Sequence, residues 1–207
     1  MPVDLTALLD PAHVAVITSE CQNGVIGAES VLPELAVSAA STVIPQGARI
    51  CAAARARGVP VIHCTAGRRA DHRGSNRNAR LFAAILRSPV RMDLGSAAAA
   101  VVAEFAVAPS DFVLSRIHGL NPMAGTDLDP VLRNLGVTTV VVIGVSVNVA
   151  ITNLVMDAVN HGYQVVLVRD AVAGVPPSYA DAVIENTLSL LATVVMTADL
   201  IARWDSA

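Results

Sequence analysis

The sequence has 207 residues and is 54% hydrophobic, although aromatic residues make up only 3% of it. A formal net charge of −3 argues against a general nucleic-acid-binding protein, and no apolar run reaches the roughly 20 residues that a membrane span needs. Since the N-terminus also lacks the layout of a signal peptide, we expect one cytoplasmic domain over 1–207 with no nucleic-acid or membrane partner.

The cysteine and lysine contents further restrict the possible location and chemistry of the protein. The three cysteines Cys21, Cys51 and Cys64 lack the spacing of a metal site and fit a reducing cytoplasm better than a disulfide framework. All fourteen basic residues are arginine, so no lysine can serve as a proton relay.

Short apolar runs rich in β-branched residues predict strands. The run 137–143 is the clearest, because it is continuous in valine and isoleucine, which is typical of a strand buried on both faces. Gly144 ends it. In chain order, the predicted strands are 13–18, 59–65, 111–115, 137–143, 165–168 and 193–196.

Helical periodicity separates these strands. After residue 148, Ile151, Val155 and Val159 recur at helical spacing until Gly162 ends the helix. The other predicted helices begin near Leu35, restart after Pro45 to end at Gly58, and cover 78–86, 96–105, 126–134 with Thr126 as N-cap, 177–191 and 199–204.

The stretch 137–168 therefore predicts a parallel strand–helix–strand crossover, which is right-handed in nearly all proteins. In such sheets ligands bind at the carboxyl ends of the strands, beside the starts of the following helices. Glu20 lies at the end of the first predicted strand, where a carboxylate usually faces this crevice, although a helix-capping or surface role is the alternative. Gln22 follows it, and we expect it to contact the ligand.

The loop 67–78 is the most polar part of the chain and, with Arg80 included, carries five arginines. It is either a solvated loop or a rim that gathers a small anionic substrate through bidentate arginine contacts. We expect Arg73 and Asn76 from this loop to bind such a substrate, together with His118 beyond the third strand. His63 is a further candidate, although His63 and Cys64 point to opposite faces of their strand.

Three stretches resemble the isochorismatase-like cysteine hydrolases: VITSECQNG at 16–24, VLSRIHGLNPMAGTDLD at 113–129 and GVSVNVAITNLVMDAVNHGYQVVLVRDA at 144–171. The resemblance runs along nearly the whole chain. It implies a Rossmann-like, three-layer α/β/α fold with a six-stranded parallel sheet, assembled as a homodimer or homotetramer.

The resemblance also implies a site made of an Asp after the first strand, a Lys after the third and a nucleophilic Cys at a helix start. Glu20, Arg116 and Ala150 stand at these positions. Alanine has no nucleophile, so thioester chemistry at position 150 is excluded. An engineered Cys→Ala change would leave the same residue, but the simultaneous Glu and Arg favour a natural variant.

The remaining groups still support hydrolysis. Glu20 can act as a general acid or base, and Arg116 can stabilise an anion but cannot relay a proton. The resemblance implies an oxyanion hole from the backbone N–H groups of Ser146 and Ala150 and a cis peptide bond before Ser146. We also expect Asn148, in the same turn, to contact the substrate. Vinyl-ether or related C–O or C–N hydrolysis is therefore the predicted reaction, as in the true isochorismatases.

Three alternatives stay open at this point. The protein could be a catalytically silent binding or regulatory protein on the same fold. Cys21 or Cys64 could replace the missing thiolate, or His63, His72 and His118 could hold a metal ion. We expect neither a metal nor a cofactor, because Ala66, Gly67 and Arg68 stand where metal-dependent relatives carry an Asp-x-His motif.

Overall fold

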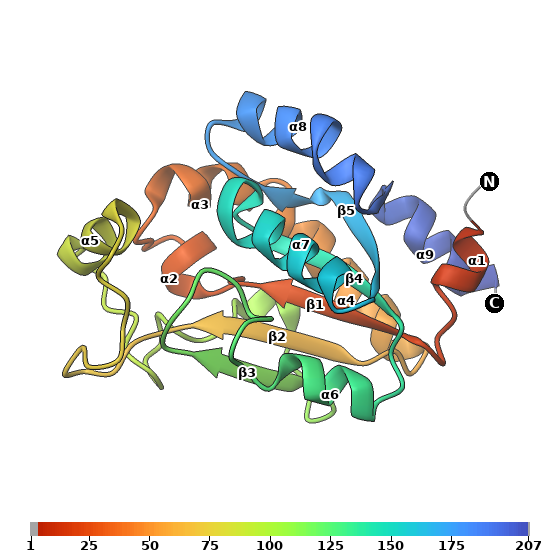
Figure 1. Ribbon diagram of the computed structural model, residues 1–207, viewed down its shortest axis with the longest axis horizontal. Helices are drawn as coiled ribbons and strands as arrows, with labels where there is room; N and C mark the ends of the chain where they lie inside the picture. The colour runs from red at the N-terminus through yellow and green to blue at the C-terminus, as the bar shows by residue number, and fades with distance from the viewer. Residues whose placement is uncertain (1–3, 207) are drawn as a thin grey trace.

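The valine-rich runs form one six-stranded, all-parallel sheet in the computed structural model, which describes residues 4–206 (Figure 1). The strand order is β3-β2-β1-β4-β5-β6. The strands are β1 (Val14–Ser19), β2 (Val61–Ala66), β3 (Phe112–Arg116), β4 (Thr139–Val145), β5 (Gln164–Ala173) and β6 (Thr193–Val195). All six predicted strands are present, and the predicted α/β fold is confirmed.

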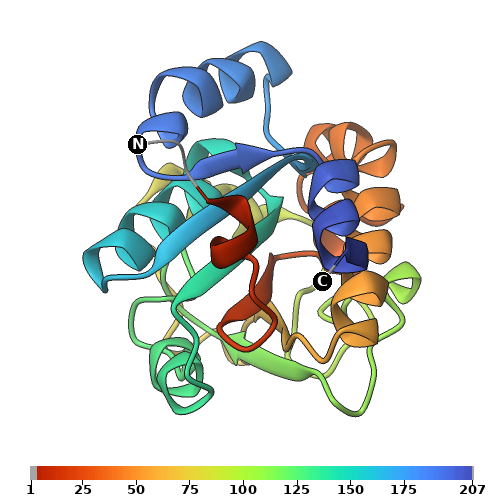
Figure 2. The ribbon, with the colours of Figure 1, turned by 90° about the vertical axis from the view of Figure 1, so that its right-hand side faces the viewer.

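Helices cover both faces of the sheet (Figure 2). The α-helices are α1 (Leu5–Leu8), α2 (Asn23–Ile26), α3 (Pro33–Ala40), α4 (Val43–Ala56), α5 (Arg80–Arg87), α6 (Leu128–Asn134), α7 (Thr152–Asn160), α8 (Pro177–Asn186) and α9 (Thr197–Ser206). Shorter turns are η1 (Ala103–Phe105), the π-helical η2 (Val147–Ile151) and η3 (Leu188–Leu190).

The alternation of side chains along the strands divides the core into two clusters. Val14 and Val16 of β1 pack with apolar residues of α3, α4 and α9, whereas Ala15 and Ile17 pack with those of α6, α7 and α8. Every residue of β1 and β4 is buried, which explains why most of each strand is a continuous apolar run rather than an alternating one.

The order in which strands are added to the sheet reverses between β1 and β4. From β1 the chain first builds outward to β2 and β3, and then returns so that β4 pairs with β1 on its other side. Ser19 and Gly144 are opposite each other at the carboxyl ends of these two strands. This is the switch point at which doubly wound sheets bind ligands.

The predicted helix at 96–105 is wrong over most of its length, since only Ala103–Phe105 forms a 3₁₀ turn. The backbone there is used for tertiary pairing instead. The carbonyl oxygens of Ala98 and Ala100 accept hydrogen bonds from the start of α2 at 2.8 and 2.9 Å, and Val101 forms an antiparallel bridge with Gln22. The helix propensity of alanine is a weak preference that this pairing overrides.

Other boundaries differ less. The fifth strand extends well past residue 168 to Ala173, and the helix predicted to reach 191 ends at Asn186. Thr126 is not the N-cap of α6, which begins at Leu128, but its Oγ1 accepts a hydrogen bond from the Leu128 N–H at 3.1 Å. In residues 4–206 no helix is both long and apolar enough to cross a membrane.

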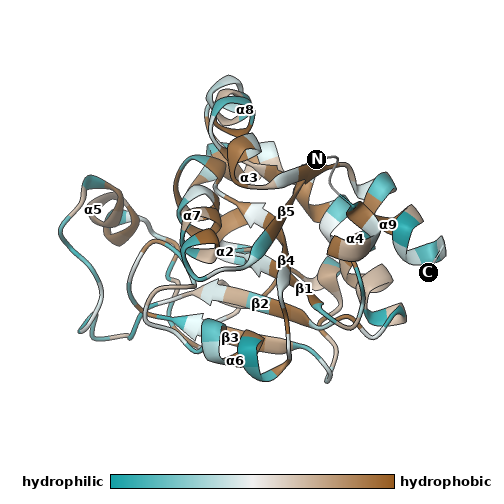
Figure 3. Cartoon of the chain, turned by 45° about the vertical axis from the view of Figure 1, so that its right-hand side comes forward, coloured by the Kyte–Doolittle hydropathy of each residue, from teal (hydrophilic) through white to brown (hydrophobic). Residues whose placement is uncertain are grey.

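Helix α5 stands apart from the two helical layers. It lies beyond the carboxyl ends of the strands, joined to the sheet by long connections, and much of its ribbon has the brown colour of hydrophobic residues in Figure 3. None of its residues is fully buried. The sequence predicts this helix at 78–86, but its place over one end of the sheet follows only from the tertiary structure.

Candidate active site

A cavity of about 170 Å³ lies at the carboxyl ends of the strands, and α5 forms part of its wall. Residues that follow four neighbouring strands line it: Glu20 after β1, Arg68 after β2, Arg116 at the end of β3, and Ser146 and Ala150 after β4. The sheet topology therefore brings Glu20, Arg116 and position 150 to one place, as predicted.

Glu20 occupies an unusual backbone conformation at the point where β1 ends. Its φ of 55° is in the left-handed region, which costs a residue with a Cβ roughly 1 kcal/mol. Hydrogen bonds hold the turn, because the Glu20 N–H donates to the Cys64 carbonyl and the Gln22 N–H donates to the Glu20 carbonyl, both at 2.9 Å. The carboxylate is thereby aimed into the cavity wall, and its side chain is 19% exposed.

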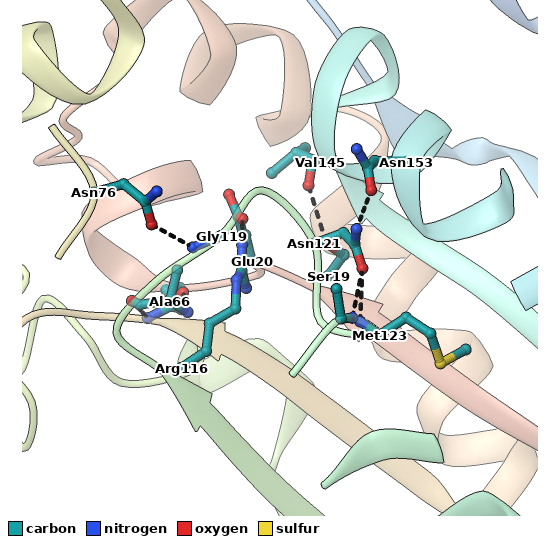
Figure 4. Close-up of polar contacts among 12 residues, drawn as sticks. Ser19, Glu20, Ala66, Asn76, Arg116, Gly119, Asn121, Met123, Val145 and Asn153 are labelled. Carbon is teal, nitrogen blue, oxygen red and sulfur yellow. Dashed lines mark hydrogen bonds and ion pairs between the residues drawn. The ribbon is translucent and has the colours of Figure 1, made fainter. Parts of the chain in front are cut away.

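Arg116 forms an ion pair with Glu20 inside the cavity wall (Figure 4). Its Nη2 donates to the Glu20 carboxylate, and only 4% of the arginine side chain is exposed. Its Nε and Nη1 are buried and have no hydrogen-bond partner among residues 4–206. The arginine therefore supplies a fixed positive charge next to the carboxylate and keeps two donors uncommitted.

The turn after β4 contributes backbone rather than reactive side chains. The Val145–Ser146 peptide bond is cis, as the resemblance implies. The Ser146 carbonyl accepts hydrogen bonds from Val149 and Ile151 at 3.1 and 3.0 Å, which closes the first turn of the helix that continues into α7. Ala150 lies in this turn, lines the cavity and is 3% exposed.

Asn76 and His118 also line the cavity. The Asn76 Oδ1 accepts a hydrogen bond from the Gly119 N–H at 2.8 Å, so it joins the arginine-rich loop to the loop after β3 (Figure 4). This contact brings two loops, far apart in sequence, together at the mouth of the site.

Gln22, Arg73 and Asn148 are not among the residues that line the cavity, where they were expected to contact a ligand. Gln22 is fully buried and braces the backbone, with its amide bonded to the N–H and carbonyl of Ala66 at 2.8 Å. The Asn148 side chain is used locally in a 2.6 Å hydrogen bond to the Val175 carbonyl. Arg73 is exposed on the loop.

His63 does not line the cavity either. It is fully buried, and both ring nitrogens are engaged, Nδ1 with the Thr18 hydroxyl at 3.0 Å and Nε2 with Asp111 at 3.2 Å. Arg55 binds the same carboxylate through Nε and Nη2. Burial lowers the pKa of His63, although the hydrogen bond to Asp111 opposes this. This network crosslinks the strands to α4.

The alternatives based on thiols and metals find no support in this geometry. Neither Cys21 nor Cys64 lines the cavity, and in residues 4–206 no group of three or more His, Cys, Asp and Glu side chains is placed to hold a metal ion. Burial raises the pKa of Cys64 to about 12, with Arg116 partly opposing it, and burial also raises the pKa of Cys21.

We therefore expect the native thiols to be unreactive. Burial raises the pKa of Cys51 to about 12 as well, and only the thiolate form attacks a disulfide reagent. A chromogenic disulfide reagent at pH 7 should label none of the three cysteines within minutes in the folded protein, and all three in denaturant. Rapid labelling of one thiol in the folded protein would restore the thiolate alternative.

The sequence reasoning missed Arg68, Ser75 and the apolar lining. Arg68 lies two residues beyond the end of β2, at the same edge as Glu20, so the rule that led to Glu20 could also have found it. The apolar lining comes mainly from α5, through Leu81, Phe82, Ile85 and Leu86, and from other segments through Val25, Val31, Leu32, Leu35, Met92, Ile117, Leu120 and Val149. No local pattern indicates that these segments meet.

Comparisons with known proteins agree with the fold. A family model described as Isochorismatase domain matches residues 14–199. The comparison with curated protein sequences gave no match.

Among solved structures, an isochorismatase family protein from Burkholderia thailandensis is 26% identical, with a TM-score of 0.78 and coverage of 94% of this chain and 96% of that one. A cysteine hydrolase from Pseudomonas syringae pv. phaseolicola 1448A is 23% identical over 95% and 94% of the two chains, with a TM-score of 0.81. An N-carbamoylsarcosine amidase from Thermoplasma acidophilum is 22% identical over 89% and 96%, with a TM-score of 0.70.

Proposed function

The chain belongs to the isochorismatase family, and from this premise we propose that it is a hydrolase of small anionic molecules that works without a cysteine nucleophile. One observation carries the proposal. Glu20 and Arg116 are paired in the wall of a cavity in which Ala150 offers only its backbone. The pair places a carboxyl group and a cation at the switch point between β1 and β4, where sheets of this kind bind ligands.

In this proposal Glu20 moves the proton. For a vinyl ether, the protonated carboxyl group donates to the terminal carbon of the double bond, and a water molecule adds to the carbon that bears the ether oxygen. The carboxylate then takes the proton that the water releases. The resulting hemiketal breaks into a carbonyl compound and an alcohol, so that one water is consumed and Glu20 is restored.

Arg116 has an electrostatic role, because a guanidinium keeps its proton at any pH at which the protein is folded. For an amide substrate, the backbone N–H groups of Ser146 and Ala150 are proposed to bind the carbonyl oxygen, on which negative charge develops when water adds. Since the relative from Thermoplasma acidophilum is named as an amidase, carboxylate-bearing amides are the second substrate class to test. Assembly as a homodimer or homotetramer stays a prediction.

Turnover should depend on Glu20 and on no other nearby carboxylate. We expect Glu20→Gln to lower kcat at least about a hundredfold on whichever vinyl ether or amide is hydrolysed, since loss of a general acid–base group typically costs this much. Glu29→Gln is the matched control, because Glu29 is exposed, near α2 and outside the cavity wall. It should leave kcat unchanged.

Two results would count against the proposal. Unchanged turnover in Glu20→Gln would remove Glu20 from the mechanism. Thermal stabilisation of the wild type by a carboxylate, with no turnover of any compound in the panel, would instead favour a silent binding protein.

A further inference from the structure

Buried donors without a partner are concentrated in the cavity wall. Five buried side-chain nitrogen or oxygen atoms lack a hydrogen-bond partner among residues 4–206, and four of them belong to residues that line the cavity. These four are Arg68 Nη1, Ser75 Oγ, and Nε and Nη1 of Arg116. Buried polar groups are nearly always paired in native proteins, so this concentration indicates a ligand that supplies the partners.

The chemistry of these atoms restricts the ligand. The three guanidinium nitrogens can only donate hydrogen bonds, and the hydroxyl group can also donate. A ligand that satisfies them must therefore present acceptors, and next to arginine the strongest acceptors are the oxygens of an anion.

Arg68 is held in place independently of Arg116. Its backbone bonds to Met92 and Leu94 at 2.9 Å, and its Nε donates to Asp93 at 3.1 Å. Its side chain is 8% exposed, so little freedom remains to be lost when a ligand binds.

The charges around Arg68 and Arg116 do not balance. Asp93 is shared between Arg68 and Arg91, and Glu20 pairs with Arg116. The cavity wall itself therefore holds two arginines, Arg68 and Arg116, but one carboxylate, Glu20, which leaves positive charge at the cavity that Asp93 only partly offsets and that a monovalent anion can neutralise.

We propose that Arg68 and Arg116 form a carboxylate subsite, and that the ligand is a compact monocarboxylate with an apolar body. The inference deepens the proposed function, on which it rests, by naming the substrate class and the residue that selects it. Beyond the donors named above, most of the lining is apolar, including one whole face of α5. A second charge on the ligand would therefore lie against hydrocarbon, where burial of an unpaired charge is strongly unfavourable.

The volume of the cavity limits the size of the apolar part of the ligand. The volume of about 170 Å³ is close to the roughly 150 Å³ of an engineered apolar cavity that binds benzene. A six-membered ring or a branched chain of similar size therefore fits, with its carboxylate at the two arginines and its apolar part against Leu81, Phe82 and Ile85 of α5.

Benzoate and benzamide test the subsite, because they share a shape and differ in charge. Isothermal titration of the full chain should show benzoate binding at least tenfold more tightly than benzamide. Arg68→Met, which keeps the length of the aliphatic stem, should weaken benzoate binding by about tenfold to a hundredfold and change benzamide binding less than threefold. Arg91→Gln is the matched control, since Arg91 binds the same Asp93 but is not in the cavity wall.

Equal affinity of the wild type for benzoate and benzamide would overturn the proposal, and this comparison needs no variant to fold. A loss of benzoate binding in Arg91→Gln as large as in Arg68→Met would also overturn it. Benzoate is not hydrolysed, so its binding is independent of turnover. Turnover of vinyl ethers without benzoate binding refutes the subsite alone, whereas benzoate binding without any turnover refutes the hydrolase alone.

Discussion

Gly144→Ala should destabilise the fold by roughly 4 kcal/mol, combining backbone strain with overpacking against a neighbouring strand. A Cβ at this position would lie 2.2 Å from the Ser19 carbonyl oxygen, 2.9 Å from the Ser19 nitrogen and 3.0 Å from the Cys21 sulfur. The φ of 112° is also one that residues with a side chain rarely adopt. Backbone on β1 cannot move away cheaply, because it is paired on both sides.

Gly162→Ala separates the two contributions. Gly162 has a comparable φ of 89°, but a Cβ there would meet nothing within 4 Å. It should therefore cost only the strain, about 1 to 2 kcal/mol. Urea unfolding followed by the fluorescence of Trp204, the one tryptophan in the sequence and a buried one, measures both variants. Similar losses in the two variants would show that β1 and β4 can separate at the site without penalty.

Most of the sheet can be predicted from the sequence because buried parallel strands have a local sequence signature. Every residue of β4 is buried, and a continuous valine and isoleucine run is the direct consequence. Once the strands are placed, the position of Glu20 follows from topology alone, since the carboxyl ends of parallel strands share one edge. The convergence of Glu20, Arg116 and Ala150 needs no further information.

The sequence does not indicate which residues, distant along the chain, form hydrogen bonds with one another in the fold. Alternation shows that His63 and Cys64 face opposite ways, but not that Asp111 and Thr18 occupy both nitrogens of His63. In the same way, the alanine-rich stretch near residue 98 has high helix propensity, and only the distant start of α2 explains why it is not helical. A polar residue near a strand end can therefore be assigned as a ligand contact or as a structural brace only when its hydrogen-bond partners are known.

Ala150→Cys should create a thiol that iodoacetamide alkylates at pH 7 on the order of a thousandfold faster than any cysteine of the wild type. The new sulfur would be in the first helical turn after β4 and in the wall of the cavity that holds Arg116. A helix N-terminus and a nearby cation both lower the pKa of a thiol. The native thiols differ in this respect, because burial raises the pKa of Cys51 and Cys64 to about 12.

Ala202→Cys provides the control, since residue 202 is exposed on α9 and should give a thiol with the ordinary pKa of about 8.5. Alkylation of the cysteine at position 150 should persist at pH 6, where that of the cysteine at position 202 falls off. Peptide mapping by mass spectrometry assigns the label. Slower labelling at position 150 than at position 202 would mean that burial outweighs the helix and Arg116.

The same variant should hydrolyse amides only weakly, although it regains a nucleophile. A thioester mechanism needs a group that takes the thiol proton and delivers it to the departing amine. Glu20 has a stem one methylene longer than the Asp of the family pattern, and Arg116, unlike a lysine, cannot release a proton. We therefore expect one rapid acylation with an activated ester and few turnovers with an amide. Fast, multiple-turnover amide hydrolysis would show that Glu20 and Arg116 can serve a thiolate as they stand, so that Ala150 alone silences thiol chemistry and the vinyl-ether proposal loses its main support.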